Sequence, residues 1–167
     1  MTDPGFHVFV QICFMATILL NGLLAGLYLA FACGIAPAFQ SIDDVTYVRT
    51  FRLINRRILN PWFLTLFFLA PLSAIVLAAL WIMSDPFANP GLFFAGVVCA
   101  LSMFFITVLR NVPLNNALER TKITEIHPAG RVRAQYENQW NAWNLMRTLS
   151  GVAAVVLLMI SLVIPMR

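Results

Sequence analysis

The chain has 167 residues, of which 60% are hydrophobic and 11% are charged, and its formal net charge is +4 at pH 7. Four apolar stretches, each near or above the ~20 residues that cross a hydrocarbon core as a helix, exclude an ordinary soluble domain. The positive charge is explained by arginines at the membrane border, so no nucleic-acid partner is predicted. We predict an all-α integral membrane four-helix bundle, a single transmembrane domain over residues 1–167 in contact with the lipid bilayer.

The first predicted helix covers residues 8–36. It is longer than the apolar region of a signal peptide, ~7–15 residues, so we expect it to be retained as a membrane span. Gly22 and Gly26 have the spacing of small residues that let a neighbouring helix approach closely. Gly34 and Pro37 are expected to end the helix.

A polar segment follows, and a short amphipathic helix is predicted within residues 40–57, lying on the membrane surface. Asp43 or Ser41 would cap its first turn. The second membrane helix is predicted over residues 58–83. It is expected to begin around Pro61, because proline is tolerated in a first helical turn.

The third membrane helix is predicted over residues 91–112, ending where Pro113 disfavours helical geometry in the residue before it. The polar stretch that follows is expected to hold further short amphipathic helices outside the membrane. The fourth membrane helix is predicted over residues 144–164, with Asn141 or Asn144 as its cap.

The basic residues predict the orientation in the membrane. Ten of them belong to the two long loops and their flanks: Arg49, Arg52, Arg56, Arg57, Arg110, Arg120, Lys122, Arg131, Arg133 and Arg147. Only Arg167 falls on the opposite side. The positive-inside rule therefore places both long loops in the cytoplasm and both termini outside, in a multi-pass protein of the inner (plasma) membrane.

Three motifs rich in asparagine and arginine lie at the predicted cytoplasmic helix ends, within residues 55–61, 110–116 and 140–147. Because these ends meet in a small bundle, and because buried amides and guanidinium groups must face protein or water, we predict that they converge on one pocket. Asparagine and arginine donors stabilise oxyanions, and tryptophans offer flat apolar walls. The expected catalytic residues are Arg56, Asn115, Asn144 and Arg147. The expected substrate-binding residues are Tyr28, Asn60, Trp62, Asn111, Trp140 and Trp143.

Each of these residues also has an ordinary structural role open to it. Asparagines cap helices, arginines extend towards the interface, and tryptophans anchor helices there. Asn21, in the middle of the first helix, is expected to hydrogen-bond to a neighbouring helix in preference to a ligand.

No metal or haem site is predicted. The two histidines, His7 and His127, fall on opposite sides of the predicted membrane and cannot share an ion. Cys13, Cys33 and Cys99 have no paired spacing and are expected to be small buried apolar residues. The membrane helices contain no acidic residue, which argues against a proton-driven transporter.

These motifs resemble the anthrone oxygenase-like family, also called domain of unknown function 1772. The resemblance rests on the Gly22–Gly26 step, residues 55–61 and 111–116, and the group Trp140, Trp143, Asn144 and Arg147. It implies a four-helix membrane fold. From a few fungal relatives it also implies oxidation of an anthrone to an anthraquinone with dioxygen and no cofactor. Asn115, Asn144 and either Arg56 or Arg147 would then hold an enolate oxygen between the tryptophans.

Two interpretations follow for function. In the first, the pocket binds a small aromatic or quinone-like molecule and oxidises it, although the sequence shows no clear general base. In the second, the chain is a non-catalytic membrane subunit whose motifs only cap and pack helices. A channel or transporter ranks last, and the sequence leaves a homo-oligomer open.

Overall fold

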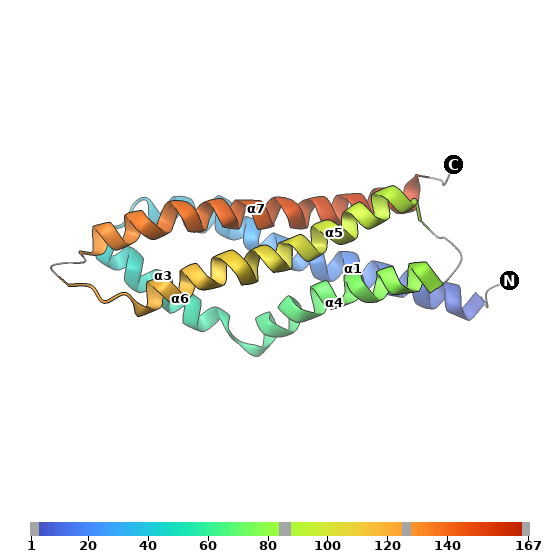
Figure 1. The fold of residues 1–167 in the computed structure, drawn as a ribbon, viewed down its shortest axis with the longest axis horizontal. Coiled ribbons are helices and arrows are strands. Elements are labelled where there is room, and N and C mark those ends of the chain that lie inside the picture. Colours follow the sequence, from blue (N-terminus) through green and yellow to red (C-terminus); the bar gives the residue numbers. More distant parts are fainter. Residues whose placement is uncertain (1–3, 84–87, 125–127, 165–167) are drawn as a thin grey trace.

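The computed structural model describes residues 4–83, 88–124 and 128–164, and every regular element in these ranges is a helix (Figure 1). The elements are α1 (Pro4–Ala30), η1 (Phe31–Ile35), α2 (Ala36–Phe39), α3 (Asp44–Ile58), α4 (Pro61–Met83), α5 (Pro90–Ile106), η2 (Thr107–Asn111), α6 (Val112–Arg120) and α7 (Ala129–Val163). Four helical spans are long and apolar enough to cross a membrane: Gly5–Phe39, Pro61–Met83, Pro90–Arg120 and Ala129–Val163. The prediction of an all-α membrane protein is confirmed.

The four spans run side by side (Figure 1). The start of α1, the end of α4, the start of α5 and the end of α7 lie at one end of the molecule, whereas α3, α6 and the start of α7 lie at the other. The segments that carry the predicted cytoplasmic loops are therefore gathered at a single end.

The span containing α7 is longer than a membrane requires. At 1.5 Å per residue, the 23 residues of α4 extend about 35 Å, close to a bilayer core, while the 35 residues of α7 extend about 53 Å. The helix begins at Ala129 and not near Asn144. Asn141 and Asn144 lie in its interior, so the prediction that one of them caps the fourth helix is wrong.

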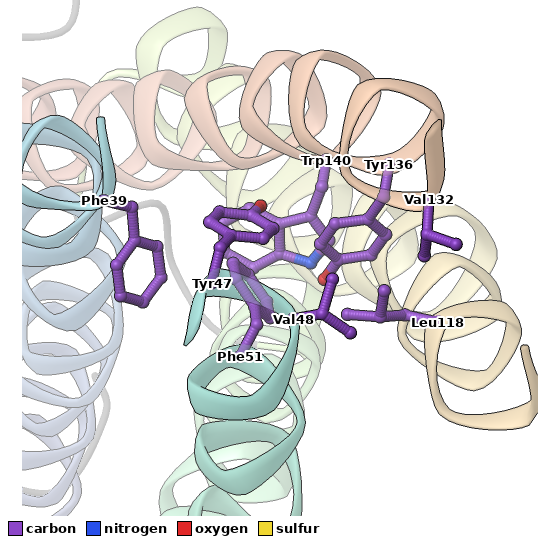
Figure 2. Packing of buried hydrophobic residues seen from close by; sticks show 8 residues of the cluster. All are labelled: Phe39, Tyr47, Val48, Phe51, Leu118, Val132, Tyr136 and Trp140. Carbon is purple, nitrogen blue, oxygen red and sulfur yellow. The ribbon is translucent and has the colours of Figure 1, made fainter. Parts of the chain in front are cut away.

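Packing against α3 explains why the polar first part of α7 is helical. Val132, Tyr136 and Trp140 follow one another at four-residue intervals, which places them on one face of the helix. Val48 and Phe51 of α3 pack against that face in a cluster that α6 completes (Figure 2). The short amphipathic helix predicted within residues 40–57 is therefore present as α3, and its apolar side packs against α6 and α7.

The start of α3 is fixed by the side chain of Asp43. Its Oδ1 atom accepts hydrogen bonds of 3.0 Å from the backbone N–H groups of Val45 and Thr46, as the capping prediction required. Hydrogen bonds from the Thr46 side chain and backbone stabilise the carboxylate and hold the pKa of Asp43 below its usual value.

Arg133 of α7 fastens this end of the molecule. Its Nη2 and Nη1 atoms donate to the carbonyl oxygens of Phe39 at 2.8 Å and Ile42 at 2.9 Å, and its Nε donates to Glu137 at 2.7 Å. The guanidinium lies 4.4 Å from the ring centroid of Tyr47. Burial, and then the charge of Glu137, raise the pKa of Tyr47, so its hydroxyl stays protonated.

The first span does not end at Gly34 and Pro37, as predicted. It widens instead into the π-helical turn η1, in which the N–H of Ala36 donates to the carbonyl of Phe31, and then continues to the end of α2. A proline cannot donate to the residue four positions earlier and its ring collides with that carbonyl. A wider turn relieves this conflict without ending the helix.

The third span also contains a π-helical turn before its proline, so the predicted end before Pro113 is wrong as well. In η2 the N–H of Val112 donates to the carbonyl of Thr107, and helix continues through α6 to Arg120. Two prolines that were expected to end membrane helices therefore sit just after π-helical turns.

The helices pack closely at small residues, α1 and α5 each against both α4 and α7. A Cβ atom on Gly151 of α7 would lie 2.7 Å from the Cβ of Ala25 on α1. A Cβ on Gly22 would make an ordinary 3.7 Å contact with Val155, and one on Gly26 would meet nothing within 4 Å. The close approach expected at the Gly22–Gly26 step is therefore provided by Gly151 on the facing helix.

Replacing Gly151 with leucine tests this contact. Gly151→Leu should lower the Tm of the detergent-solubilised protein by several degrees, since overpacking a helix interface costs roughly 1–3 kcal/mol. Gly26→Leu is the matched control, because open space faces that position. Equal Tm shifts in the two variants would contradict the packing described here.

Candidate functional site

A cavity of about 390 Å³ lies between α3 and the ends of the membrane spans that surround it. Its walls are mainly apolar and aromatic, and the aromatic lining residues are Tyr28, Phe31, Phe51, Phe63, Phe67 and Trp140. Both π-helical turns border it, η1 through Phe31 and η2 through Thr107. Phe31 and Ile35 of η1 and Thr107 of η2 thus line one space, and single π-helical turns are frequent at functional sites.

Arg147 of α7 forms a buried polar end of this cavity. Its side chain belongs to a residue that is only 6% exposed. Nε and Nη2 donate to Oδ1 of Asn144 at 3.1 and 2.8 Å, and Nη1 donates to Oγ1 of Thr107 at 3.3 Å. The guanidinium carbon lies 3.8 Å from the ring centroid of Tyr28 and 5.2 Å from that of Trp140.

The partners of Arg147 are all neutral. None of the ion pairs found among the described residues involves Arg147. Burying a cation within a membrane span costs several kcal/mol unless an anion or a polar network compensates it. The hydrogen bonds above use three of its five N–H donors. Within the part of the chain that the structure describes, the positive charge of Arg147 at the cavity therefore has no acidic counter-ion.

Asn144 binds the guanidinium group of Arg147 directly. Its Oδ1 accepts both bonds from the guanidinium, and its Nδ2 donates to the carbonyl oxygen of Tyr28 at 3.3 Å. The residue is 1% exposed and is not among those that line the cavity. It holds the arginine against α1.

Asn115 of α6 lines the cavity and is held by two donors. Its Oδ1 accepts from the hydroxyl of Tyr136 at 2.9 Å and from Nε1 of Trp140 at 2.7 Å. Because an indole nitrogen can only donate, the atom facing it must be the oxygen, which fixes the orientation of the amide. The Nδ2 group of Asn115 takes no part in these two hydrogen bonds.

An ion pair stands at the exposed rim of the cavity. Nε of Arg56, on α3, donates to Oε1 of Glu119, on α6, at 2.9 Å, and its Nη2 bonds to the same oxygen. The side chains are 68% and 36% exposed, and both border the cavity. Arg56 is thus mostly exposed, whereas Arg147 is buried.

The other predicted site residues lie outside the cavity lining. Asn60 caps α4, accepting from the N–H of Phe63 at 3.1 Å. Asn111 is buried and donates to the carbonyl oxygen of Trp140 at 3.3 Å. Trp62 is 88% exposed, and Trp143 stacks under Arg110, whose guanidinium carbon is 4.8 Å from the ring. Asn60 therefore caps a helix, Asn111 joins η2 to α7, and none of the four residues lines the cavity.

The structure adds site residues that the sequence did not single out, among them Thr107 and Glu119. A signal was present, because Thr107, Asn111, Asn115 and Glu119 form a polar series at four-residue intervals. Asn55 also lines the cavity, and its buried Nδ2 has no hydrogen-bond partner among the residues that the structure describes.

Asn21 has the packing role that was predicted for it. Its Nδ2 donates to the carbonyl oxygen of Thr17 at 2.9 Å and, across to α4, to that of Ala70 at 3.1 Å. The residue is fully buried, and the bond joins α1 to α4.

Metal-ligating side chains do not gather in groups of three or more within residues 4–83, 88–124 and 128–164. His127, one of the two histidines considered for haem, lies outside these ranges.

Comparison with known proteins identifies one family. A family model described as anthrone oxygenase matches residues 62–157, which is more than half of the chain. The match runs from the start of α4 through Arg147 and so includes the buried end of the cavity. No curated protein and no solved structure matches the chain.

A double-mutant cycle tests the link between Asn144 and Arg147. Asn144→Leu should destabilise the protein by roughly 2–3 kcal/mol, because the buried guanidinium loses its acceptor. In an Arg147→Met background the same change should cost clearly less, as measured by thermal unfolding in detergent. Equal costs in both backgrounds would show that Asn144 does not act through Arg147.

Proposed function

Because this chain belongs to the anthrone oxygenase family, we propose that its cavity binds a planar aromatic carbon acid of the anthrone type and oxidises it with dioxygen. The observation that carries the proposal is Arg147, a buried cation with neutral partners at one end of an aromatic cavity. An anionic ligand would supply the missing counter-charge.

The size and lining of the cavity support this class of ligand. Its volume of about 390 Å³ falls within the roughly 300–1,000 Å³ of typical small-molecule sites. Phe31, Phe63 and Trp140 offer flat apolar surface to a ring system. Arg147 and the Nδ2 of Asn115 are the donors available to a ligand oxygen.

The chemistry needs an anion. Removing a proton from the acidic CH₂ of an anthrone gives an enolate whose charge rests largely on the carbonyl oxygen. Arg147 would stabilise that oxygen, and the electron-rich carbon would transfer electrons to dioxygen. Overall, the CH₂ carbon loses two hydrogens and gains one oxygen as a carbonyl, and the second oxygen atom leaves as water. In this proposal Asn144 positions Arg147.

Arg147→Met separates ligand binding from packing. The variant should bind anthrone at least tenfold more weakly in a titration under argon, and should form anthraquinone in air no faster than the spontaneous reaction. Its Tm without ligand should be unchanged or higher, because a buried charge is replaced by an apolar side chain of similar length.

The alternative role, a non-catalytic subunit in which the motifs only pack helices, makes the opposite prediction. A lower Tm for Arg147→Met, together with no binding of anthrone by the unmodified protein, would support it. Binding that is equally tight in the variant would show that Arg147 does not contact the ligand.

We also propose that the protein resides in the inner (plasma) membrane with the cavity end towards the cytoplasm, from the distribution of basic residues. Alkaline phosphatase, which needs an oxidising compartment, should be active when fused after Met83 and inactive when fused after Lys122. The reverse pattern of activity would contradict this orientation.

A further inference from the structure

Among the described residues that line the cavity, Glu119 is the one that carries a carboxylate. We propose that Glu119 is the general base that removes the proton from the acidic carbon of the substrate. This inference rests on the function proposed above, and it supplies the base that the sequence motifs lacked. The other ionisable groups of the lining are Tyr28, Arg56 and Arg147, and these are a phenol and two cations.

The ion pair with Arg56 holds the carboxylate of Glu119 in a defined position through one of its two oxygen atoms. Nε and Nη2 of Arg56 both bond to Oε1. The second oxygen, Oε2, is not used in these bonds and can accept a proton. Since α3 carries Arg56 and α6 carries Glu119, the pair joins two elements across the rim of the cavity. Arg56 is a positioning residue in this arrangement.

We assign one of the two reacting positions of an anthrone to Arg147 and the other to Glu119. In this class of molecule the carbonyl oxygen and the acidic CH₂ lie on opposite edges of the central ring. Arg147 is 6% exposed and Glu119 has a side chain that is 36% exposed, and both border the same cavity. In this proposal the ligand binds with its oxygen at the buried cation and its CH₂ at the more exposed carboxylate.

The proton-transfer step is balanced as follows. The C–H bond breaks and its proton bonds to Oε2 of Glu119, while the electron pair moves through the ring system to the oxygen held by Arg147. A carboxylate can remove this proton because the enolate is stabilised in the same step. The exposed side of Glu119 then returns the proton to water, and dioxygen, the co-substrate, takes up electrons from the enolate afterwards.

Hydrogen–deuterium exchange measures this step without dioxygen. Anthrone is incubated under argon in deuterated buffer with the detergent-solubilised protein, and deuterium uptake at its CH₂ is followed by mass spectrometry and corrected for spontaneous exchange. Glu119→Gln should lower the catalysed rate at least 100-fold, within the range of general-base effects. Its affinity for anthrone should stay within threefold of the unmodified protein.

Three further variants isolate the carboxylate. Glu119→Asp keeps it and should retain a measurable catalysed rate, which tests the proposal even if the glutamine variant folds poorly. Arg56→Gln breaks the pair and should lower exchange less than Glu119→Gln does. Glu137→Gln removes a carboxylate from the ion pair with Arg133, outside the cavity lining, and should leave exchange unchanged.

The outcomes distinguish this inference from the proposed function. Catalysed exchange at the unmodified rate in Glu119→Gln would overturn the assignment of the base and leave anthrone oxidation standing. If the unmodified protein neither binds anthrone nor accelerates exchange, the proposed function fails and the base assignment fails with it.

Discussion

A positive charge within a membrane-spanning helix is the constraint on which the rest of this site depends. Arg147 is buried, and the described part of the chain gives it amide, hydroxyl and aromatic partners without an acid. Such a group is costly in a low-dielectric environment, so its neighbours must be ordered around it. Asn144 fixes the guanidinium, and Thr107 brings η2 towards it.

The helices that hold these partners owe their shape to two prolines. At η1 and η2 the chain widens by one hydrogen-bond position just before Pro37 and Pro113, and it then continues as helix. In both spans the helix thus continues past the proline, into α2 and into α6, and α6 brings Asn115 and Glu119 to the cavity.

At the end of the molecule that contains α3 and α6, the helices enclose their own cluster of buried hydrophobic residues. Trp140 belongs to the cluster that α2, α3, α6 and the first part of α7 form (Figure 2). Trp140 also lines the cavity. Arg133 of α7 holds the end of α2 and the loop before α3 through the backbone carbonyls of Phe39 and Ile42. Because Trp140 and Asn115 share a hydrogen bond, the packing of this cluster determines where the cavity amide lies.

The sequence alone determined the four apolar spans and the polar character of their ends, because hydropathy depends on composition over about 20 residues. It also determined the family and drew attention to Arg147, Asn115 and Tyr28. The tertiary structure decided which polar residues face a common space. Asn111 and Asn144 are buried outside the cavity lining, Asn60 caps a helix and Trp62 is exposed, although all lie in or beside the asparagine- and arginine-rich motifs. Capping, packing and ligand binding use the same donors and acceptors, so only the position of the neighbouring helix distinguishes them.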